Sequence, residues 1–174
     1  MKFKISIVIV VVLSIFYANF SVFANPPNVS QPSESSKTPE TSEVRLNPDE
    51  SEMFAALNSA REERGLPPLA LDNELAKLAR MKAEDMLEHG YFAHISPTFG
   101  SPFEMMKNFE ISYNSAGENI AENRTVAGAS AALMLSDSHR ANILSERFNR
   151  VGIGIVDGPR EFKTMVQMFI ESVE

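Results

Sequence analysis

The stretch NELAKLARMKAEDMLEHG, residues 73–90, carries the strongest secondary-structure signal of the chain. Its apolar side chains recur at spacings of three and four, which places them on one face of a helix. These positions are Leu75, Leu78, Ala79, Met86 and Leu87. Asp72 supplies an N-cap before the stretch and Gly90 a left-handed stop after it. The pattern predicts a helix between Asp72 and Gly90 that buries one side.

The sequence before this helix predicts a second one. Residues 47–50, NPDE, combine an N-cap, a first-turn proline and acids that suit the positive end of the helix dipole, and Gly65 supplies the stop. We expect a helix over about 48–64. The following GLPPLALD is expected to run extended to Asp72.

Three shorter helices are predicted downstream. Residues 101–104, SPFE, form a capping box with proline at the first helical position and begin a helix that reaches about residue 109. Residues 125–135 are alanine-rich and are expected to be helical. SHRANIL, residues 138–144, is expected to be a last short turn capped by Asp137 or Ser138.

The C-terminus changes to a period of two. RVGIGIVDG, residues 150–158, alternates branched side chains with small ones, and EFKTMVQMFIES follows a turn at Asp157-Gly158. This pattern predicts an antiparallel hairpin. With helices first and strands last, we predict an α+β fold in which helices pack on a small antiparallel sheet.

The composition excludes several classes of function. The chain has 174 residues and a formal net charge of -7, and an acidic surface repels nucleic acid phosphates and anionic lipid head groups. We therefore expect no nucleic acid partner. The chain has no cysteine, which excludes disulfides, thiolate metal sites and a thiol nucleophile.

The N-terminal region is expected to lie outside the folded domain. Residues 1–24 combine lysines, an apolar run and a small-residue end, as in a secretory signal peptide cleaved after Ala24. An uncleaved membrane anchor is the alternative. Residues 25–46 are rich in Pro, Ser, Thr and Glu and are expected to form a disordered linker before a domain at 47–174. This organisation predicts a secreted, extracellular or envelope-associated protein.

Three ionisable side chains are candidate site residues. Glu118 lies between a glycine and an asparagine in SAGENIAENR, residues 115–124, where a solvated turn is the simplest interpretation. His94 lies in a loop that precedes the helix at Ser101, and loops on a rigid scaffold often carry function. His139 lies beside Arg140 in a polar patch, where a cap with a salt bridge is the structural alternative.

Read together, four segments resemble a known family. They are NSAREERGLPPLALDNELAKLARMKAEDML, YFAHISP, AGENIA and HRANIL, followed by strands containing VQMF. The chain resembles the CAP superfamily (cysteine-rich secretory proteins, antigen-five and pathogenesis-related proteins) in its bacterial SCP-like extracellular branch, over about residues 50–171. The resemblance implies an α-β-α sandwich with a histidine- and glutamate-lined cleft. It assigns His94, Glu118 and His139 to that cleft.

This resemblance also suggests what the cleft binds. Two neutral imidazoles and a carboxylate could hold a divalent metal such as zinc. As auxiliary residues we include Asn119, Arg140 and Gln167. The chain departs from the branch because it has no tryptophan and has Asp137-Ser138 before His139, and because its closing strand carries Gln167 where eukaryotic members have a histidine.

Three functions remain open from the sequence. We expect a non-enzymatic binding module for an extracellular lipid, glycan, peptide or protein. The first alternative is a hydrolase acting on an extracellular peptide, glycan or lipid, either metal-assisted through His94, Glu118 and His139 or using Ser96 or Ser138 as nucleophile. The second is a structural envelope or spore-coat protein in which the three side chains only brace loops.

Overall fold

A four-stranded sheet lies at the centre of the molecule. The computed structural model describes residues 45–173, and the strand order is β1-β3-β4-β2. The strands are β1 (Ala70–Leu71), β2 (Tyr113–Asn123), β3 (Arg150–Asp157) and β4 (Lys163–Ser172). β4 pairs antiparallel with β2 and β3, as the predicted hairpin requires, whereas β1 pairs parallel with β3. The sheet is therefore mixed, and β2 is one of its edges.

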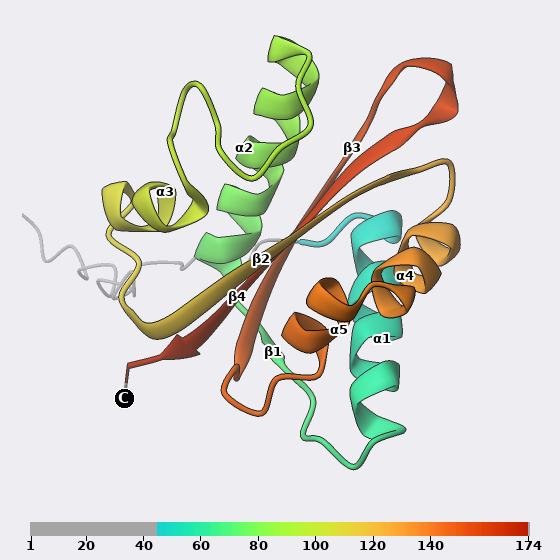
Figure 1. Cartoon of the computed structure of the whole chain (residues 1–174), viewed down its shortest axis with the longest axis vertical. Helices are drawn as coiled ribbons and strands as arrows, with labels where there is room; N and C mark the ends of the chain where they lie inside the picture. The colour runs from blue at the N-terminus through green and yellow to red at the C-terminus, as the bar shows by residue number, and fades with distance from the viewer. Residues whose placement is uncertain (1–44, 174) are drawn as a thin grey trace, which may run out of the picture. The chain divides into compact units, whose positions relative to one another are not determined.

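Helices cover both faces of this sheet, which confirms the predicted α-β-α sandwich (Figure 1). One face carries α2 (Asn73–His89) and α3 (Pro102–Asn108). The other carries α1 (Pro48–Glu62), α4 (Val126–Leu135) and α5 (Asp137–Ile143). β2 runs along the edge between the two helical layers, so its alternate side chains enter different layers.

Most helix boundaries follow the predicted caps. The Asn47 side chain accepts from the Glu50 N–H in a capping box, and the Asp72 side chain caps α2. Gly90 ends α2 in the left-handed conformation at φ 65°. The short helix predicted at α5 is present, but its predicted cap was wrong, because the N-cap is Ser136 and no side chain caps it. Asp137 lies inside the helix, where its carboxylate accepts instead from Arg140 at 2.5 Å.

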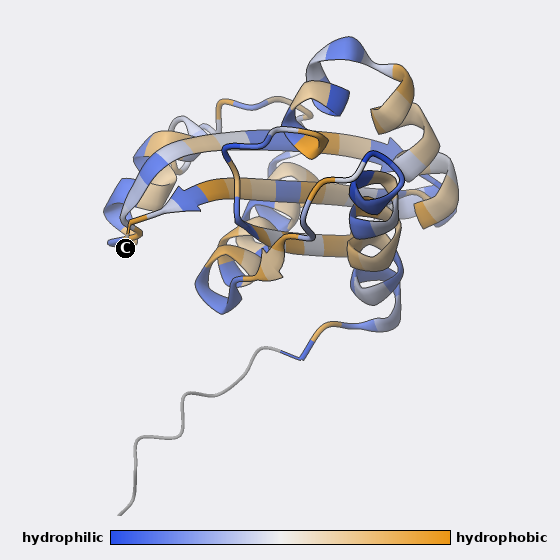
Figure 2. Ribbon diagram, turned by 90° about the horizontal axis from the view of Figure 1, so that it is seen from below, coloured by the Kyte–Doolittle hydropathy of each residue, from blue (hydrophilic) through white to orange (hydrophobic). Residues whose placement is uncertain are grey.

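Alternation along β3 divides the interior into two hydrophobic clusters. Val151, Ile153 and Ile155 point into the cluster under α1, α4 and α5. The residues between them, Gly152 and Gly154, face α2, and a Cβ on either would lie 2.1 Å from the α2 backbone. The glycines thus let α2 lie directly on the strand. The strands carry apolar residues along much of their length in Figure 2.

The sequence did not predict β2. Its eleven residues include the whole AGENIA motif, which had the appearance of a turn. The strand places Ala116, Ile120 and therefore Glu118 on the α2 side, and Asn119 and Ala121 on the α4 and α5 side. Glu118 is consequently a buried strand residue with 7% exposure rather than a solvated turn residue.

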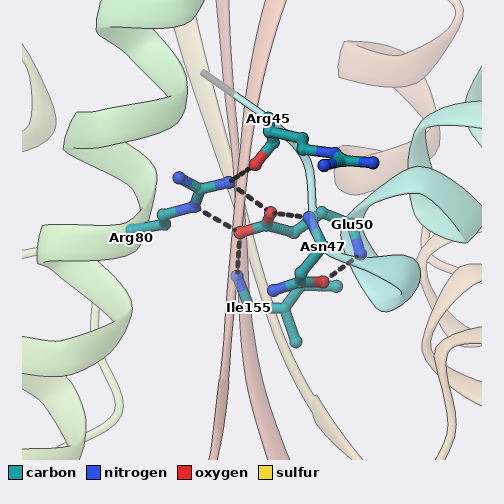
Figure 3. Close-up of polar contacts among 5 residues, drawn as sticks. All are labelled: Arg45, Asn47, Glu50, Arg80 and Ile155. Carbon is teal, nitrogen blue, oxygen red and sulfur yellow. Dashed lines mark hydrogen bonds and ion pairs between the residues drawn. The ribbon is translucent and has the colours of Figure 1, made fainter.

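An ion pair between the buried Glu50 and the partly exposed Arg80 covers the edge of β3 that β1 leaves unpaired (Figure 3). Glu50, at 0% exposure, accepts from Arg80 Nε at 2.6 Å and Nη2 at 2.5 Å, and from the Ile155 N–H at 3.4 Å. Arg80 Nη2 also donates to the Arg45 carbonyl. This Glu50–Arg80 pair joins α1, α2 and β3 around the edge, and it occupies a backbone donor that an exposed edge would present.

The described elements belong to one compact unit, Thr41–Glu174. Residues 1–44 lie outside the described part of the chain, and with them the predicted signal peptide and nearly all of the predicted linker. Within residues 45–173, no helix is long and apolar enough to cross a membrane.

Candidate functional site

The His94 loop follows α2 and is held by its own backbone. Ser96 and Gly100 exchange two backbone hydrogen bonds of 2.8 and 3.0 Å, and Gly100 adopts a left-handed φ of 75°. The Ser96 hydroxyl accepts from the N–H groups of Thr98 and Phe99. These contacts close a tight turn two residues after His94, which gives the histidine a defined backbone although its side chain is 51% exposed.

Glu118 approaches the loop from the edge strand. The preceding Gly117 lies close to the α5 side, since a Cβ there would lie 3.1 Å from side-chain atoms of Asn142 and Phe148 and those side chains would have to shift slightly. The Glu118 carbonyl accepts from Asn142 Nδ2 on α5 at 3.2 Å. The strand is thereby fixed on the α5 side, and the Glu118 carboxylate points into the α2 side, where its side chain is only 1% exposed.

His94 and Glu118 form a hydrogen-bonded pair. The distance from His94 Nδ1 to Glu118 Oε1 is 2.7 Å. Burial raises the pKa of Glu118, while the hydrogen bond from His94 and the charge of Lys82 oppose that increase. An Nδ1–H that donates to the carboxylate leaves Nε2 as the acceptor of a neutral imidazole. Nε2 has no hydrogen bond to any described residue, so it is available to solvent or a ligand.

A buried polar cluster lies beneath the loop, and we did not predict it. Lys82 Nζ donates to Tyr91 Oη and to the His94 carbonyl, each at 3.1 Å. Tyr91 Oη and Ser96 Oγ both donate to Asp85 Oδ2, the latter at 2.6 Å. Burial raises the pKa of Asp85, but hydrogen bonds from Ser96, Thr98 and Tyr91 outweigh it and the net pKa is lowered. Asp85 is therefore held as a carboxylate.

This cluster left a signal in the sequence. Lys82 falls three residues after Ala79 and four before Met86, in the middle of the apolar stripe of α2. Asp85 is also buried, at 4% exposure. Charged residues at core positions of an amphipathic helix require buried partners. The positions of Lys82 and Asp85 in the helix could therefore have predicted a buried polar cluster.

His139 does not join the His94–Glu118 pair. It lies on α5, across β2 from the α2 layer, and its imidazole is not within 4.0 Å of the Glu118 carboxylate. Burial lowers the pKa of His139, and the positive charge of His94 lowers it further. The charge of one histidine therefore affects the other. Its backbone carbonyl, rather than its ring, is bonded to Asn119.

The predicted metal ligands are not assembled. Among residues 45–173, no three side chains of His, Asp or Glu are placed to hold a metal ion. Glu118 Oε1 is already bonded to His94, and Oε2 is buried without a partner. A cation would have to displace packed atoms to reach this carboxylate. The three residues therefore do not fit a metal in this arrangement.

The auxiliary residues support the fold around the pair. Asn119 Nδ2 donates to Gln167 Oε1 at 3.1 Å, and Asn119 Oδ1 accepts from Asn142 at 2.9 Å. Asn119 and Gln167 are buried at 0% and 2% exposure, on the opposite side of the sheet from Glu118. Arg140 donates to the Met134 carbonyl and to Asp137, both on its own side of the sheet. None of the three is hydrogen-bonded to the His94 ring.

The two serines considered as nucleophiles are engaged elsewhere. Ser96 is 3% exposed, and its hydroxyl donates to Asp85 rather than to a histidine. Ser138 Oγ lies 3.3 Å from Ser136 Oγ at the start of α5. A serine nucleophile must lie within hydrogen-bonding reach of its base. Neither serine meets this condition.

A surface pocket with a mixed polar and apolar lining adjoins the His94 loop. It has a volume of ≈ 360 Å³ and contacts Tyr91 and Phe92 of the loop, Leu87 of α2 and Glu122 of β2. Phe92 and Ile95, on either side of His94 in the chain, are 46% and 63% exposed. A larger groove of ≈ 700 Å³ lies away from the pair, between α3 and the C-terminal end of β4.

Comparisons with known proteins identify the family. Residues 54–169 match the model of the CAP family, described as the cysteine-rich secretory protein family. The chain is 47% identical to the uncharacterised protein YkwD of Bacillus subtilis strain 168 over 109 residues, which are 62% of this chain and 42% of YkwD. The chain thus matches less than half the length of that relative.

Solved structures show the same fold. An extracellular protein with an SCP domain from Bacillus anthracis strain Ames superposes with a TM-score of 0.67 at 30% identity, covering 74% of this chain and 45% of that one. An outer surface protein of Borrelia burgdorferi gives a TM-score of 0.68 at 19% identity, covering 75% of this chain and 97% of that one.

The protein is a cysteine-free CAP domain protein with bacterial SCP-domain relatives. The family match spans α1 to β4, so the predicted resemblance is confirmed. Its bacterial structural neighbours are described as extracellular or outer surface proteins.

Proposed function

We propose that this chain is an extracellular or envelope-associated binding module whose ligand contacts His94. The observation that carries the proposal is the difference in exposure within the pair: the His94 side chain is 51% exposed and the Glu118 side chain 1%. Only the imidazole can reach a ligand. Glu118 then acts from below, by orienting the ring and holding the proton on Nδ1.

The pocket beside the loop suggests the chemistry of the ligand. Apolar and aromatic side chains line it, with Glu122 at one side, and pockets of this size suit small molecules or single side chains. His94 is not among the residues that line the pocket, so a ligand whose apolar body fills it must extend past Phe92 to bring a polar group to the His94 imidazole. The acidic charge of the chain favours neutral or cationic ligands.

Extracellular location is part of the proposal. It is supported by the signal-peptide pattern of residues 1–24 and by the bacterial neighbours described as extracellular or outer surface proteins. Detection of the processed chain in the medium or envelope fraction, with its new N-terminus at Asn25, would support it. A chain retained in the cytoplasm with Met1 intact would contradict it.

The binding role can be tested by NMR. We would titrate 3-phenylpropionamide and 4-phenylbutylamine, each an apolar body with one polar group, into the labelled unit Thr41–Glu174. The expected result is a shift of the Phe92 and His94 signals in the unmodified chain, with the Phe92 shift lost in His94→Ala. His89→Ala is the matched control, because His89 is also half-exposed but lies at the end of α2. Unchanged signals, or equal binding by His94→Ala, would contradict the proposal.

A purely structural role predicts a different result from the same variants. If the pair only braces the loop, His94→Ala should lower the unfolding temperature by many degrees. Because this variant also removes the only donor that the described residues offer to the buried Glu118 carboxylate, the binding role predicts a loss of stability together with a loss of probe binding, whereas the bracing role predicts a loss of stability and no probe binding by the unmodified chain.

A further inference from the structure

The side chain beneath the His94 loop that most needs explanation is a lysine. Lys82 is 1% exposed and is one of the largest fully buried side chains. Its ammonium lies 4.9 Å from the centre of the Tyr91 ring and donates to Tyr91 Oη and the His94 carbonyl. All the acceptors that it contacts are neutral. An ammonium buried in this way needs an opposite charge nearby.

The charges of two buried carboxylates act on the pKa of Lys82. Burial lowers the pKa of Lys82, and the charges of Glu118 and then Asp85 counteract that decrease. Asp85 already accepts hydrogen bonds from Tyr91 and Ser96. Glu118 accepts only from His94, and its Oε2 atom is buried without a donor among the described residues. Glu118 is therefore the carboxylate whose charge is least compensated.

We propose that Lys82 is a positioning residue of the His94–Glu118 pair. Its ammonium anchors the His94 backbone through the carbonyl and supplies the buried positive charge that balances the Glu118 carboxylate. One side chain on α2 thus controls both the place of the imidazole and the charge of the group that orients it. This inference rests on the proposed function, since it concerns the same site.

Packing beneath the loop requires a side chain of the size of Lys82 but does not require its charge. A neutral side chain could fill the same volume and a neutral donor could satisfy the His94 carbonyl. Among titratable side chains, Tyr91 bonds directly to the ammonium, whereas Glu118 of β2 and Asp85 of α2 act on it through their charge; His94 meets it only through its backbone carbonyl. Among them, Glu118 is the one whose titration should report the loss of the charge most directly.

The test is the pH titration of the Glu118 carboxyl carbon by ¹³C NMR in the unit Thr41–Glu174. Lys82→Met and Lys82→Gln remove the charge, and Lys82→Gln keeps a donor for the His94 carbonyl. We expect the Glu118 midpoint to rise by about one pH unit in both, and to stay near the original value in Lys82→Arg. Lys77→Met is the matched control, since Lys77 pairs with Glu74 on the exposed face of α2.

A folded Lys82→Gln with an unchanged Glu118 midpoint would overturn the proposal. If neither neutral variant folds, ¹⁵N NMR of Lys82 Nζ in the unmodified chain decides it. A protonated ammonium at pH values where Glu118 is ionised supports the pairing, and a neutral amine there refutes it. Because no ligand is needed, failure here leaves the binding role of His94 untouched, and failure to bind the probes leaves Lys82 untouched.

Discussion

At the residue scale, the two members of the His94–Glu118 pair differ in solvent exposure, and each has a different role. The imidazole faces solvent and the carboxylate is enclosed, with 2.7 Å between Nδ1 and Oε1. An enclosed carboxylate is strongly affected by pH because burial disfavours its charge. Ionisation of Glu118 should therefore change the free energy of unfolding as the pH is varied.

We predict that Glu118→Gln flattens the pH profile of stability. Burial raises the pKa of Glu118 above its ordinary 4.5, so the folded chain binds this proton more tightly than the unfolded chain. The free energy of unfolding should then fall as the pH rises from 4.5 through the folded pKa, and remain lower at neutral pH. Gln cannot ionise and should not show this decrease.

Urea denaturation between about pH 4 and pH 8 measures this difference. Glu122→Gln is the control, because Glu122 is an exposed carboxylate on the same side of β2. Profiles of Glu118→Gln and the unmodified chain that run parallel would show that Glu118 does not titrate abnormally.

At the element scale, the close contact of α2 with β3 depends on two glycines. A Cβ at Gly152 would lie 2.1 Å from the Leu75 carbonyl carbon. We predict that Gly152→Ala lowers the unfolding free energy by about 3 kcal/mol, because the α2 backbone must move away. Gly117→Ala should cost only about 1 kcal/mol, since its Cβ would meet side chains at 3.1 Å. Equal losses in chemical denaturation would contradict this account.

The Glu50–Arg80 pair gives a second prediction at this scale. Glu50→Ala leaves the Arg80 guanidinium without its carboxylate and the Ile155 N–H without its acceptor. We expect a loss of about 3 kcal/mol, measured by thermal and urea unfolding. Glu52→Ala, an exposed position on the same helix, should change stability by less than about 0.5 kcal/mol. Similar values for both variants would mean that the pair does not hold the edge.

The elements differ in how far their sequence predicted them. The helices have local signals, such as the Asn47 capping box and the Gly90 stop, and these were read correctly. β2 has none, because Glu118 and Asn119 look like turn residues until the partners on each side of the sheet are known. Long-range contacts, rather than propensity, make this segment a strand.

At the scale of the whole molecule, the sandwich brings distant residues together at the β2 edge. The pairing of His94 with Glu118 was assigned by family resemblance, since no spacing rule links a loop to a strand 24 residues later. The same resemblance assigned His139 to the cleft, and its ring is not bonded to the pair, although the charge of His94 acts on its pKa. The sequence carries no information on which layer a short helix joins, and α5 places His139 across the edge strand from Glu118.

The domain should be independent of the chain before it. Both hydrophobic clusters are formed entirely by residues between Met53 and Ile170. We predict that the unit Thr41–Glu174 and a chain starting at Asn25 unfold in one cooperative transition at the same temperature, within about 2 °C. Calorimetry measures both. A large difference would show that residues 25–40 contribute to the fold.

The most direct test of the account is the tautomer of His94, read from long-range ¹H–¹⁵N NMR correlations at a pH where the ring is neutral. We predict the Nδ1–H form, with Nε2 unprotonated toward solvent, and a mixture of forms in Glu118→Ala. This result would show that the buried carboxylate sets the face that the imidazole offers to a ligand. A neutral His94 protonated on Nε2 in the unmodified protein would contradict the account.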